Sequence, residues 1–543
     1  MTERRLPDPG LSGLSGPSPS GSPAVPRTLV TLSSGDFWGF EGRPVDVQVD
    51  VAERATPSFS IVGLPGKSTR ESRDRIRTAI HNSGFRFPRA RILVNLAPAC
   101  REKHGVGFDL PVALGILIAS RQVLAGAGGD GLGARLGRSG FLGELGLHGE
   151  VRPVRGALLI ADRLKEQGVR DYVVARKNAR EVAFLEDIVV YPVAHLRDAV
   201  TALAGELPPH PRHETPLTRV LPTDFDDLDF LDVRGQEATK RGCLVAAAGH
   251  HNILLNGPPG VGKTMLARRI PGILPPLTVT EAMEVLRVRS VLEGDGSLEL
   301  PTRRPFRSPH HTVSYAGLVG GGNNPRPGEV TRAHRGVLFL DEFAEFSRRV
   351  LDALREPLEA ESITVGRSSG SATFPAGVLL VAAMNPCPCG YLGHPRRVCT
   401  CTPRLVQSYR GRISGPLTDR LDVFLQVAAP ESCQILGAPR PGELDSVSMA
   451  ELVASARRQQ SRRWGEGGTN GQVSLRRLLH REVVDVKALE TLRRYADKLS
   501  LSARGFARVL RVARTLADLE EQEMAGDRHV LEALQFRHSL ERS

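Results

Sequence analysis

The sequence predicts an α/β protein whose centre is a parallel sheet carrying a glycine-rich loop. Three observations support this prediction. A short apolar segment, "NILLN", runs directly into a glycine-rich phosphate-binding motif, and short apolar segments then alternate with helical patterns up to about residue 430. Strand signals are weak after about residue 446, where helical periodicity dominates. Alternating strands and helices are typical of a parallel sheet, whereas helical periodicity without strands is typical of a bundle.

The composition is that of a globular protein with a basic balance. The 543 residues include 72 Lys and Arg against 60 Asp and Glu. This excess suits a polyanionic partner such as nucleic acid, although general solubility explains it equally well. No apolar run reaches the roughly 18 residues that span a bilayer, and four of the seven cysteines cluster closely. We therefore expect a cytoplasmic protein with no membrane partner.

Local composition divides the chain into a tail, folded regions and a linker. The first folded region opens with two strand patterns, "RPVDVQVDVA" and "RARILVNLAP", on either side of a helix pattern that ends at Gly84. The last region contains a clear amphipathic helix, "LSARGFARVLRVARTLADLE". The predicted limits are a disordered tail at 1–28, a mixed domain at 29–203, a proline-rich linker at 204–223, an α/β domain at 224–432 and a helical domain at 446–543.

The phosphate-binding motif is the most specific signal in the chain. It matches G-x-x-x-x-G-K-[ST] in full, between a strand pattern and a helix pattern. Backbone amides of such a loop and the N-terminus of the following helix bind phosphates. We expect Lys263 to reach the β- and γ-phosphates of ATP and Thr264 to ligate Mg²⁺. The motif comprises Gly257, Pro258, Pro259, Gly260, Val261, Gly262, Lys263 and Thr264.

Two further strand patterns end in polar residues suited to hydrolysis. "GVLFLDEF" ends in Asp341, expected to hold Mg²⁺ through water, and Glu342, expected to polarise the attacking water. Acid pairs at strand ends are common, so this match gains force mainly from its place downstream of the loop. "AGVLLVAAMN" ends in Asn385, which we expect to face the γ-phosphate and the water. Arg420 stands just before another strand pattern, "DVFLQV".

Long stretches of the chain resemble the YifB/ComM family of magnesium-chelatase-like AAA+ ATPases. The resemblance rests on "RPFRSPHHTVSYAGLVGGGNNPRPGEVTRAHRGVLFLDEF", "GELGLHGEVRPVRGAL" and "LSARGFARVLRVARTLADL". It implies a Lon-protease-like first domain of the ribosomal S5 domain 2-like fold, an AAA+ core with a helix-2 insert, and a helical lid. It also implies a homo-hexamer that translocates DNA and promotes branch migration during natural transformation. A magnesium-chelatase motor subunit and a protein-remodelling ring remain alternatives.

The same resemblance assigns roles to single residues. Asn385 takes the sensor-1 position, and Arg420 becomes an arginine finger that reaches the neighbouring subunit's site; a salt bridge to Asp419 or Asp422 is the alternative for Arg420. Arg504 takes the sensor-2 position, with Arg508 as a second candidate. Gln236 is expected to lie near the adenine.

A Lon-like fold raises the question of peptidase activity, and the residues argue against it. The position of the catalytic serine falls at about Gly107, and that of the lysine falls at about Leu158. Neither residue can act as a nucleophile or base. We therefore expect the first domain to be a non-proteolytic scaffold or DNA guide.

Two segments without acidic residues are candidate DNA contacts. Residues 303–328 hold four arginines, two adjacent histidines and a glycine cluster, and we expect them to line a pore. Support of the nucleotide site is the alternative for Arg307, His310 and His311. Residues 387–417 hold five arginines and the pattern C-x-C-x₉-C-x-C. Cys387, Cys389, Cys399 and Cys401 form a plausible structural Zn²⁺ site, although C-x-C is tighter than usual and unligated thiols are the alternative.

Overall fold

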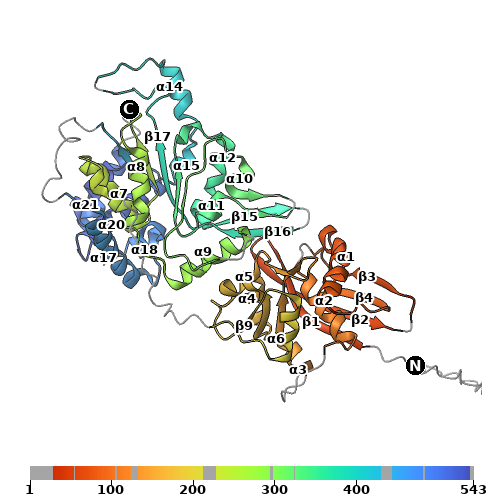
Figure 1. Cartoon of the computed structure of the whole chain (residues 1–543). Helices are drawn as coiled ribbons and strands as arrows, with labels where there is room; N and C mark the ends of the chain where they lie inside the picture. Colours follow the sequence, from red (N-terminus) through yellow and green to blue (C-terminus); the bar gives the residue numbers. More distant parts are fainter. Residues whose placement is uncertain are drawn as a thin grey trace, which may run out of the picture.

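The computed structural model describes most of the chain (Figure 1). The described residues are 28–53, 55–103, 107–123, 132–211, 228–293, 298–322, 324–367, 370–394, 396–429, 443–480, 483–499 and 501–537. The predicted tail up to residue 27 and the predicted linker from residue 212 onward lie outside these ranges. No helix within them is long and apolar enough to cross a bilayer. We refer below to an N-terminal part (28–211), a nucleotide-binding part (228–429) and C-terminal helices (443–537).

The N-terminal part is built on a mixed seven-stranded sheet in the order β3-β4-β2-β1-β5-β8-β9. Both predicted strand patterns are confirmed. In β2, alternate residues from Val45 to Val51 are buried, as expected for a strand with one face on the core. The predicted helix between them is confirmed as α1, after which Gly84 adopts φ +82°. The strands are β1 (Thr28–Trp38), β2 (Glu41–Ala52), β3 (Ser58–Val62), β4 (Arg91–Ala97), β5 (Ser139–Leu142), β8 (Asp171–Ala175) and β9 (Val189–Val193), with a small hairpin of β6 (Glu144–Leu145) and β7 (Val151–Arg152).

Helices cover this sheet. The helix α2 is wholly buried and apolar after its first residue, Asp109, which is typical of a helix in the centre of a core. The helices of this part are α1 (Lys67–Asn82), α2 (Asp109–Ala119), α3 (Leu132–Gly137), α4 (Ala157–Glu166), α5 (Arg176–Val182) and α6 (Leu196–Ala204).

The nucleotide-binding part contains the predicted parallel sheet. Its five strands lie in the order β11-β14-β17-β10-β18, and every neighbouring pair is parallel. Continuous apolar sequence in β10, β14 and β17 reflects complete burial between two layers of helices. The strands are β10 (Ile253–Asn256), β11 (Phe306–Arg307), β14 (Val337–Leu340), β17 (Leu379–Met384) and β18 (Val423–Gln426).

Two hairpins and several short helices complete this part. The hairpins are β12 (Gly320–Gly321) with β13 (Arg326–Pro327), and β15 (Ser362–Arg367) with β16 (Gly370–Pro375). The helices are α7 (Glu237–Gly249), α8 (Lys263–Ile273), α9 (Val279–Leu292), α10 (Tyr315–Val319), α11 (Glu329–Arg332), α12 (Arg348–Asp352), α13 (Pro357–Ala360), α14 (Pro403–Arg410) and α15 (Gly415–Thr418).

The C-terminal helices pack beside α7 and α8 (Figure 1). One apolar cluster contains residues of α7, of the sheet and of α20, so the helices share a core with the nucleotide-binding part. The predicted amphipathic helix is confirmed as α20, whose buried side is mainly apolar but also includes Arg508, Arg514, Thr515 and Asp518. The helices are α17 (Ser446–Trp464), α18 (Leu475–Leu478), α19 (Val486–Lys498), α20 (Ala503–Leu519) and α21 (Asp527–Gln535).

The N-terminal part packs against α9 and the β15–β16 hairpin. Leu286 of α9 belongs to the apolar cluster of α4, and Trp38 belongs to the cluster that contains Phe374. An ion pair joins Arg287 to Asp162 at 2.7 Å. The two parts therefore meet through apolar packing and charge together.

Glu181 makes this contact sensitive to pH. It lies on α5, only 1% exposed, with Ser290 of α9 close enough to hydrogen-bond. Burial raises the pKa of Glu181 to about 7, and hydrogen bonds from Ser290 and Asn178 oppose that shift only in part. The folded protein therefore keeps a proton on Glu181 at pH values where the unfolded chain, with a pKa near 4.5, has lost it. The contribution of Glu181 to stability therefore falls as pH rises from about 4.5 to 7 and levels off above that range.

We expect Glu181→Gln to remove this pH dependence, because the amide stays neutral. Between pH 4.5 and 7, the titration of Glu181 lowers the free energy of unfolding of wild type by about 3 kcal/mol at most. Thermal unfolding of both proteins between pH 5 and pH 8 measures it, and Glu181→Gln should be the more stable at pH 8. Glu186→Gln, at an exposed position nearby, is the matched control. Parallel pH profiles for wild type and Glu181→Gln would contradict the expectation.

Candidate nucleotide-binding and hydrolysis site

The phosphate-binding loop connects β10 to α8 at the carboxyl edge of the parallel sheet. Gly260 and Gly262 adopt φ +80° and +89°, a region that favours glycine. A Cβ at Gly257 would lie 2.3 Å from the Val427 carbonyl oxygen, so the loop can start there only with glycine. Strand, tight loop and helix together direct backbone amides toward one point, as an anion site requires.

Lys263 brings the loop and the end of β17 together. Its Nζ donates to the carbonyl oxygens of Gly257 (2.6 Å) and Pro258 (2.9 Å) and to Asn385 Oδ1 (3.0 Å). The side chain is largely buried, and this burial lowers the pKa of Lys263, while the charge of Asp341 acts in the opposite direction. Lys263 and Asn385 thus lie where both can contact one terminal phosphate.

Thr264 and Asp341 place two oxygens at the start of α8 and the end of β14. Thr264 Oγ1 donates to Asp341 Oδ2 at 2.8 Å. A hydroxyl and a carboxylate are the hard oxygen ligands that Mg²⁺ prefers. The two side chains therefore fit the predicted magnesium site, with Asp341 Oδ1 engaged by the Glu342 amide at 2.9 Å.

Glu342 contacts a histidine from the insert that precedes β14. His311 Nδ1 lies 2.9 Å from Glu342 Oε2, and Glu342 adopts φ +51°, a strained backbone for a non-glycine residue. This contact places His311 beside the predicted hydrolytic acid and agrees with the alternative that the insert supports the nucleotide site. Sequence reasoning did not pair these two side chains; the adjacent histidines were the available signal.

Gln236 lies against the loop with one polar atom unsatisfied. Its Nε2 donates to the carbonyl oxygens of Val261 (2.9 Å) and Ala428 (3.1 Å). Its Oε1 is buried and has no hydrogen-bond partner among the described residues. A buried acceptor beside the phosphate-binding loop needs a donor, and the exocyclic amine of adenine is one. The residues present thus fit ATP.

Arg420 and Arg504 lie together around Glu359, away from the phosphate-binding loop. Both approach Glu359: Arg420 pairs with its Oε2, and Arg504 lies 3.7 Å from its Oε1. They line a cleft of about 430 Å³ that Arg508 and Arg511 also line. Asp419 and Asp422, the alternative partners considered for Arg420, instead lie 3.9 and 3.3 Å from Arg508. Arg508 is largely buried between them, whereas the Arg504 side chain is 58% exposed, which favours Arg504 as the arginine that reaches outward.

The phosphate-binding loop lies at the carboxyl edge of the sheet, where the parallel strands end. The cleft lies at the opposite edge, where these strands begin. The loop follows β10, whereas Arg420 precedes β18, which is parallel to β10 and paired with it. Asn252, just before β10, donates from Nδ2 to the Arg420 carbonyl oxygen at 3.0 Å. A strand of this length separates the two edges by about 13 Å. Arg420 and its own phosphate-binding loop therefore do not form one site.

Comparisons with known proteins give three family matches and several relatives of nearly the full length. The family described as "Magnesium chelatase, subunit ChlI" matches residues 229–435, "Subunit ChlI of Mg-chelatase" matches 47–178, and "Magnesium chelatase, subunit ChlI C-terminal" matches 443–537. The YifB protein of Salmonella typhimurium is 39% identical over 502 residues, covering 92% of this chain and 95% of YifB. The competence protein ComM of Haemophilus influenzae is 39% identical over 519 residues, covering 94% of this chain and 97% of ComM.

The chain belongs to the YifB/ComM family of magnesium-chelatase-like AAA+ proteins. Membership implies that this YifB/ComM protein uses ATP and Mg²⁺. The 38 kDa magnesium-chelatase subunit of Rhodobacter capsulatus is also similar, at 27% identity over 175 residues that cover 29% of this chain and 50% of the subunit. The α/β class and the parallel sheet predicted from sequence are confirmed.

Some arginines of the insert at residues 303–328 form ion pairs with acidic residues of the same chain. Arg304 pairs with Glu281 at 2.9 Å and Arg307 with Glu329 at 2.8 Å, so both hold the fold together. Arg326 in the β12–β13 hairpin is exposed. Arg367 in the β15–β16 hairpin is also exposed and donates from Nε to the Gly322 carbonyl oxygen at 3.1 Å. The two hairpins therefore lie side by side and present arginines to solvent.

Proposed function

We propose that this YifB/ComM protein is an ATP hydrolase that works as a homo-hexameric DNA translocase in the cytoplasm, promoting branch migration during homologous recombination in natural transformation. The observation that carries the proposal is the division of the catalytic groups between opposite sheet edges. One copy holds the phosphate-binding loop with Glu342 at one edge and Arg420 with Arg504 at the other. A complete site then needs a second copy, and head-to-tail contacts form a ring when the rotation from copy to copy closes on itself.

In that site each residue has a distinct task. Lys263 binds the terminal phosphates, Thr264 and Asp341 orient the metal, and Asn385 and Glu342 position and polarise the attacking water. Arg420 and Arg504 of the neighbouring copy stabilise charge that develops on the transferred group. ATP supplies the phosphoryl group and its free energy, and Mg²⁺ neutralises phosphate charge. Gln236 holds the base.

The hairpins supply the contact with DNA. Arg326 and Arg367 are exposed on adjacent hairpins of the nucleotide-binding part, and exposed arginines suit the phosphate backbone. Near full-length similarity to a competence protein supports DNA as the polymer. The N-terminal part acts as a non-proteolytic Lon-like scaffold: at the position expected for a catalytic lysine, Leu158 is fully buried in an apolar cluster. The C-terminal helices serve as the lid, and the domain limits predicted from sequence stay proposals.

Branch migration on a synthetic Holliday junction tests the proposal. We expect ATP-dependent conversion of the junction by wild type and none by Glu342→Gln, with ATP hydrolysis stimulated by single-stranded or branched DNA. Hydrolysis without DNA stimulation, together with no DNA binding, would reject the proposal. A chelatase motor would show activity only with a porphyrin-binding partner, and a remodelling ring would retain protein clients after nuclease treatment.

The contact between His311 and Glu342 links the insert to hydrolysis. We expect His311→Ala to bring the ATPase rates with and without DNA to within about twofold of each other, because the insert loses its contact with the hydrolytic acid. Phosphate release measured with saturating DNA and without DNA gives the ratio of the two ATPase rates. His310→Ala is the matched control, since His310 bonds to Thr312 instead. A wild-type ratio in His311→Ala would show that the contact does not couple the two.

A further inference from the structure

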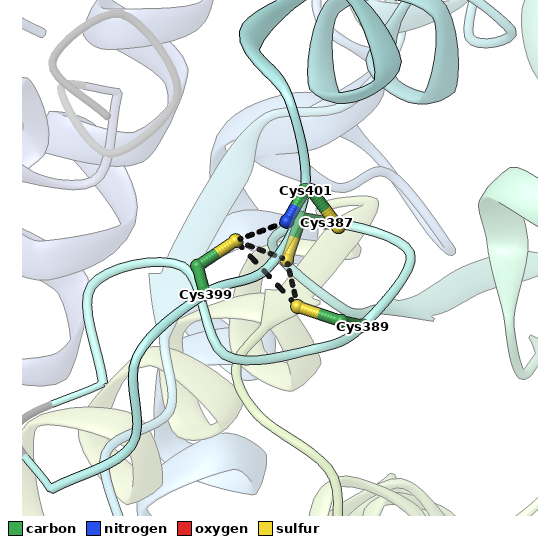
Figure 2. Close-up of side chains that lie close together, drawn as sticks. All are labelled: Cys387, Cys389, Cys399 and Cys401. Atoms are coloured by element: carbon green, nitrogen blue, oxygen red, sulfur yellow. Dashed lines mark hydrogen bonds between the residues drawn. The ribbon is translucent and has the colours of Figure 1, made fainter.

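Four cysteines meet at one point in the segment between β17 and α14 (Figure 2). The Sγ atoms of Cys387, Cys389, Cys399 and Cys401 all lie within 4.8 Å of one another. Three of the separations are 3.3, 3.6 and 3.5 Å, for 387–389, 387–399 and 389–399. The short C-x-C spacing, a concern at the level of sequence, does not keep the sulfurs apart.

These separations match one metal ion better than the other uses of clustered thiols. Sulfurs placed tetrahedrally around Zn²⁺ at about 2.3 Å lie about 3.8 Å from each other. A disulfide needs sulfurs about 2.05 Å apart, and a multi-iron cluster spreads its thiolates over several irons. Four sulfur ligands leave no open position, which is typical of a structural site rather than a catalytic one.

The described residues between the two cysteine pairs make local polar contacts, with His394 Nδ1 accepting from the amides of Arg396 and Arg397, but they lack apolar packing. From Tyr391 to Thr402 none of the described residues is buried, and none lies in a helix or strand. Val398 is 88% exposed. A connection of this length without regular structure or apolar packing requires another constraint. The four cysteine sulfurs lie together, and the Cys401 amide donates to Cys399 Sγ at 3.4 Å.

The surrounding charge suits a bound tetrathiolate. Four thiolates with one Zn²⁺ carry a net charge of about −2, which is costly without compensating cations. Residues 387–417 contain five arginines and no acid. Arg396 and Arg397 lie between the two cysteine pairs, and Arg397 also bonds to the Tyr391 hydroxyl at 2.6 Å.

The constrained segment borders the nucleotide site. Cys387 follows Asn385 by two residues and is fully buried. Gly390 lies against the phosphate-binding loop, since a Cβ built there would come within 2.6 Å of Pro259 Cδ. The position of the segment therefore affects both Asn385 and the loop.

We propose that Cys387, Cys389, Cys399 and Cys401 bind one structural Zn²⁺ ion, and that this ion holds the segment against the phosphate-binding loop so that Asn385 is positioned. Asn385 contacts the reacting groups; the four cysteines act through it as positioning residues.

Metal analysis of the full-length protein tests whether the four cysteines bind Zn²⁺. We expect about one zinc per chain after purification in reducing buffer, released by a mercurial reagent with a colorimetric zinc indicator, and cobalt substitution giving the visible absorption of a tetrahedral thiolate site. Cys389→Ser and Cys399→Ser should each lower zinc at least tenfold. Cys100→Ser, at an exposed cysteine outside the cluster, is the matched control and should keep it. Less than about 0.1 zinc per chain in wild type after incubation with Zn²⁺, iron in its place, or cluster disulfides by thiol counting would each overturn the assignment.

Gly390→Ala tests whether the segment positions Asn385 against the phosphate-binding loop, and it changes none of the four cysteines. Gly390 has φ +81°, and the added methyl group meets Pro259, so the segment must shift while its cysteines remain. We expect full zinc content with kcat for ATP lowered about tenfold and KM changed less. Unchanged kcat would show that the metal site and the phosphate-binding loop are not coupled. The zinc count stands whether or not the protein acts on DNA, so failure of either proposal is separately visible.

Discussion

Glu342→Gln should bind ATP as wild type does and hydrolyse it at least about a hundredfold more slowly. The amide keeps the size of the carboxylate and can still accept a hydrogen bond from His311, but it cannot polarise water or take its proton. Lys263, Thr264 and Asp341 remain in place, so binding is expected to survive. Steady-state phosphate release and equilibrium binding of a fluorescent ATP analogue measure the two properties separately.

The neighbouring acid provides the control. Glu345 ends the short 3-10 helix Phe343–Glu345 that follows Glu342, but it pairs with Arg412 at 2.7 Å. Glu345→Gln should therefore retain most of the activity. Rapid hydrolysis by Glu342→Gln, or an equal loss in Glu345→Gln, would remove Glu342 from its assigned role.

Arg420→Ala should lower ATP turnover about a thousandfold, because the site in each copy then lacks its stabilising cation. The cation is expected from the neighbouring copy, so the loss should be repaired by subunit mixing. In assemblies formed from equal amounts of Arg420→Ala and Lys263→Ala chains, about a quarter of the interfaces pair an intact phosphate-binding loop with an intact Arg420. Each variant alone should be inactive, and the mixture should recover roughly that fraction of wild-type activity.

A second mixture distinguishes this geometry from simple stabilisation. Arg420 and Arg504 lie in one cleft at one sheet edge, so assemblies of Arg420→Ala with Arg504→Ala contain no interface with both arginines intact. That mixture should stay inactive, with size-exclusion chromatography confirming assembly in both cases. Recovery in the second mixture but not in the first, or full turnover by a lone subunit, would contradict a shared site.

The nucleotide site could be predicted in two ways, from contiguous residues for the phosphate-binding loop and from the ends of apolar runs for the other groups. The spacing of Gly257, Gly262 and Lys263 permits one local backbone path between a strand and a helix, and that path already defines an anion site. Asp341 and Asn385 could be assigned because apolar runs predict parallel strands, and parallel strands end at a common edge. The distances from Thr264 to Asp341 and from Lys263 to Asn385 agree with that reasoning.

Contacts between distant segments could not be predicted in the same way. His311 meets Glu342 because β11 lies beside β14, and the adjacent histidines alone do not reveal which neighbour they face. The choice between Arg504 and Arg508 was open in the sequence, since both lie on one helix. The packing of α20 buries Arg508 between Asp419 and Asp422 and leaves Arg504 exposed beside Arg420.

The sequence by itself predicted the chemistry proposed for this protein: the phosphate-binding loop and the cysteine pairs from residues a few positions apart, and the magnesium ligand Asp341 and the hydrolytic acid from the end of an apolar run. The tertiary structure alone decided how these groups are distributed. The parallel direction of β10 and β18 places Arg420 about a strand's length from the phosphate-binding loop, and the packing of α20 brings Arg504 beside Arg420. Folding of an irregular segment brings four sulfurs within 4.8 Å of one another. The reason is physical: local spacing constrains the backbone over a few residues, whereas side chains remote in sequence meet only through the packing of whole elements.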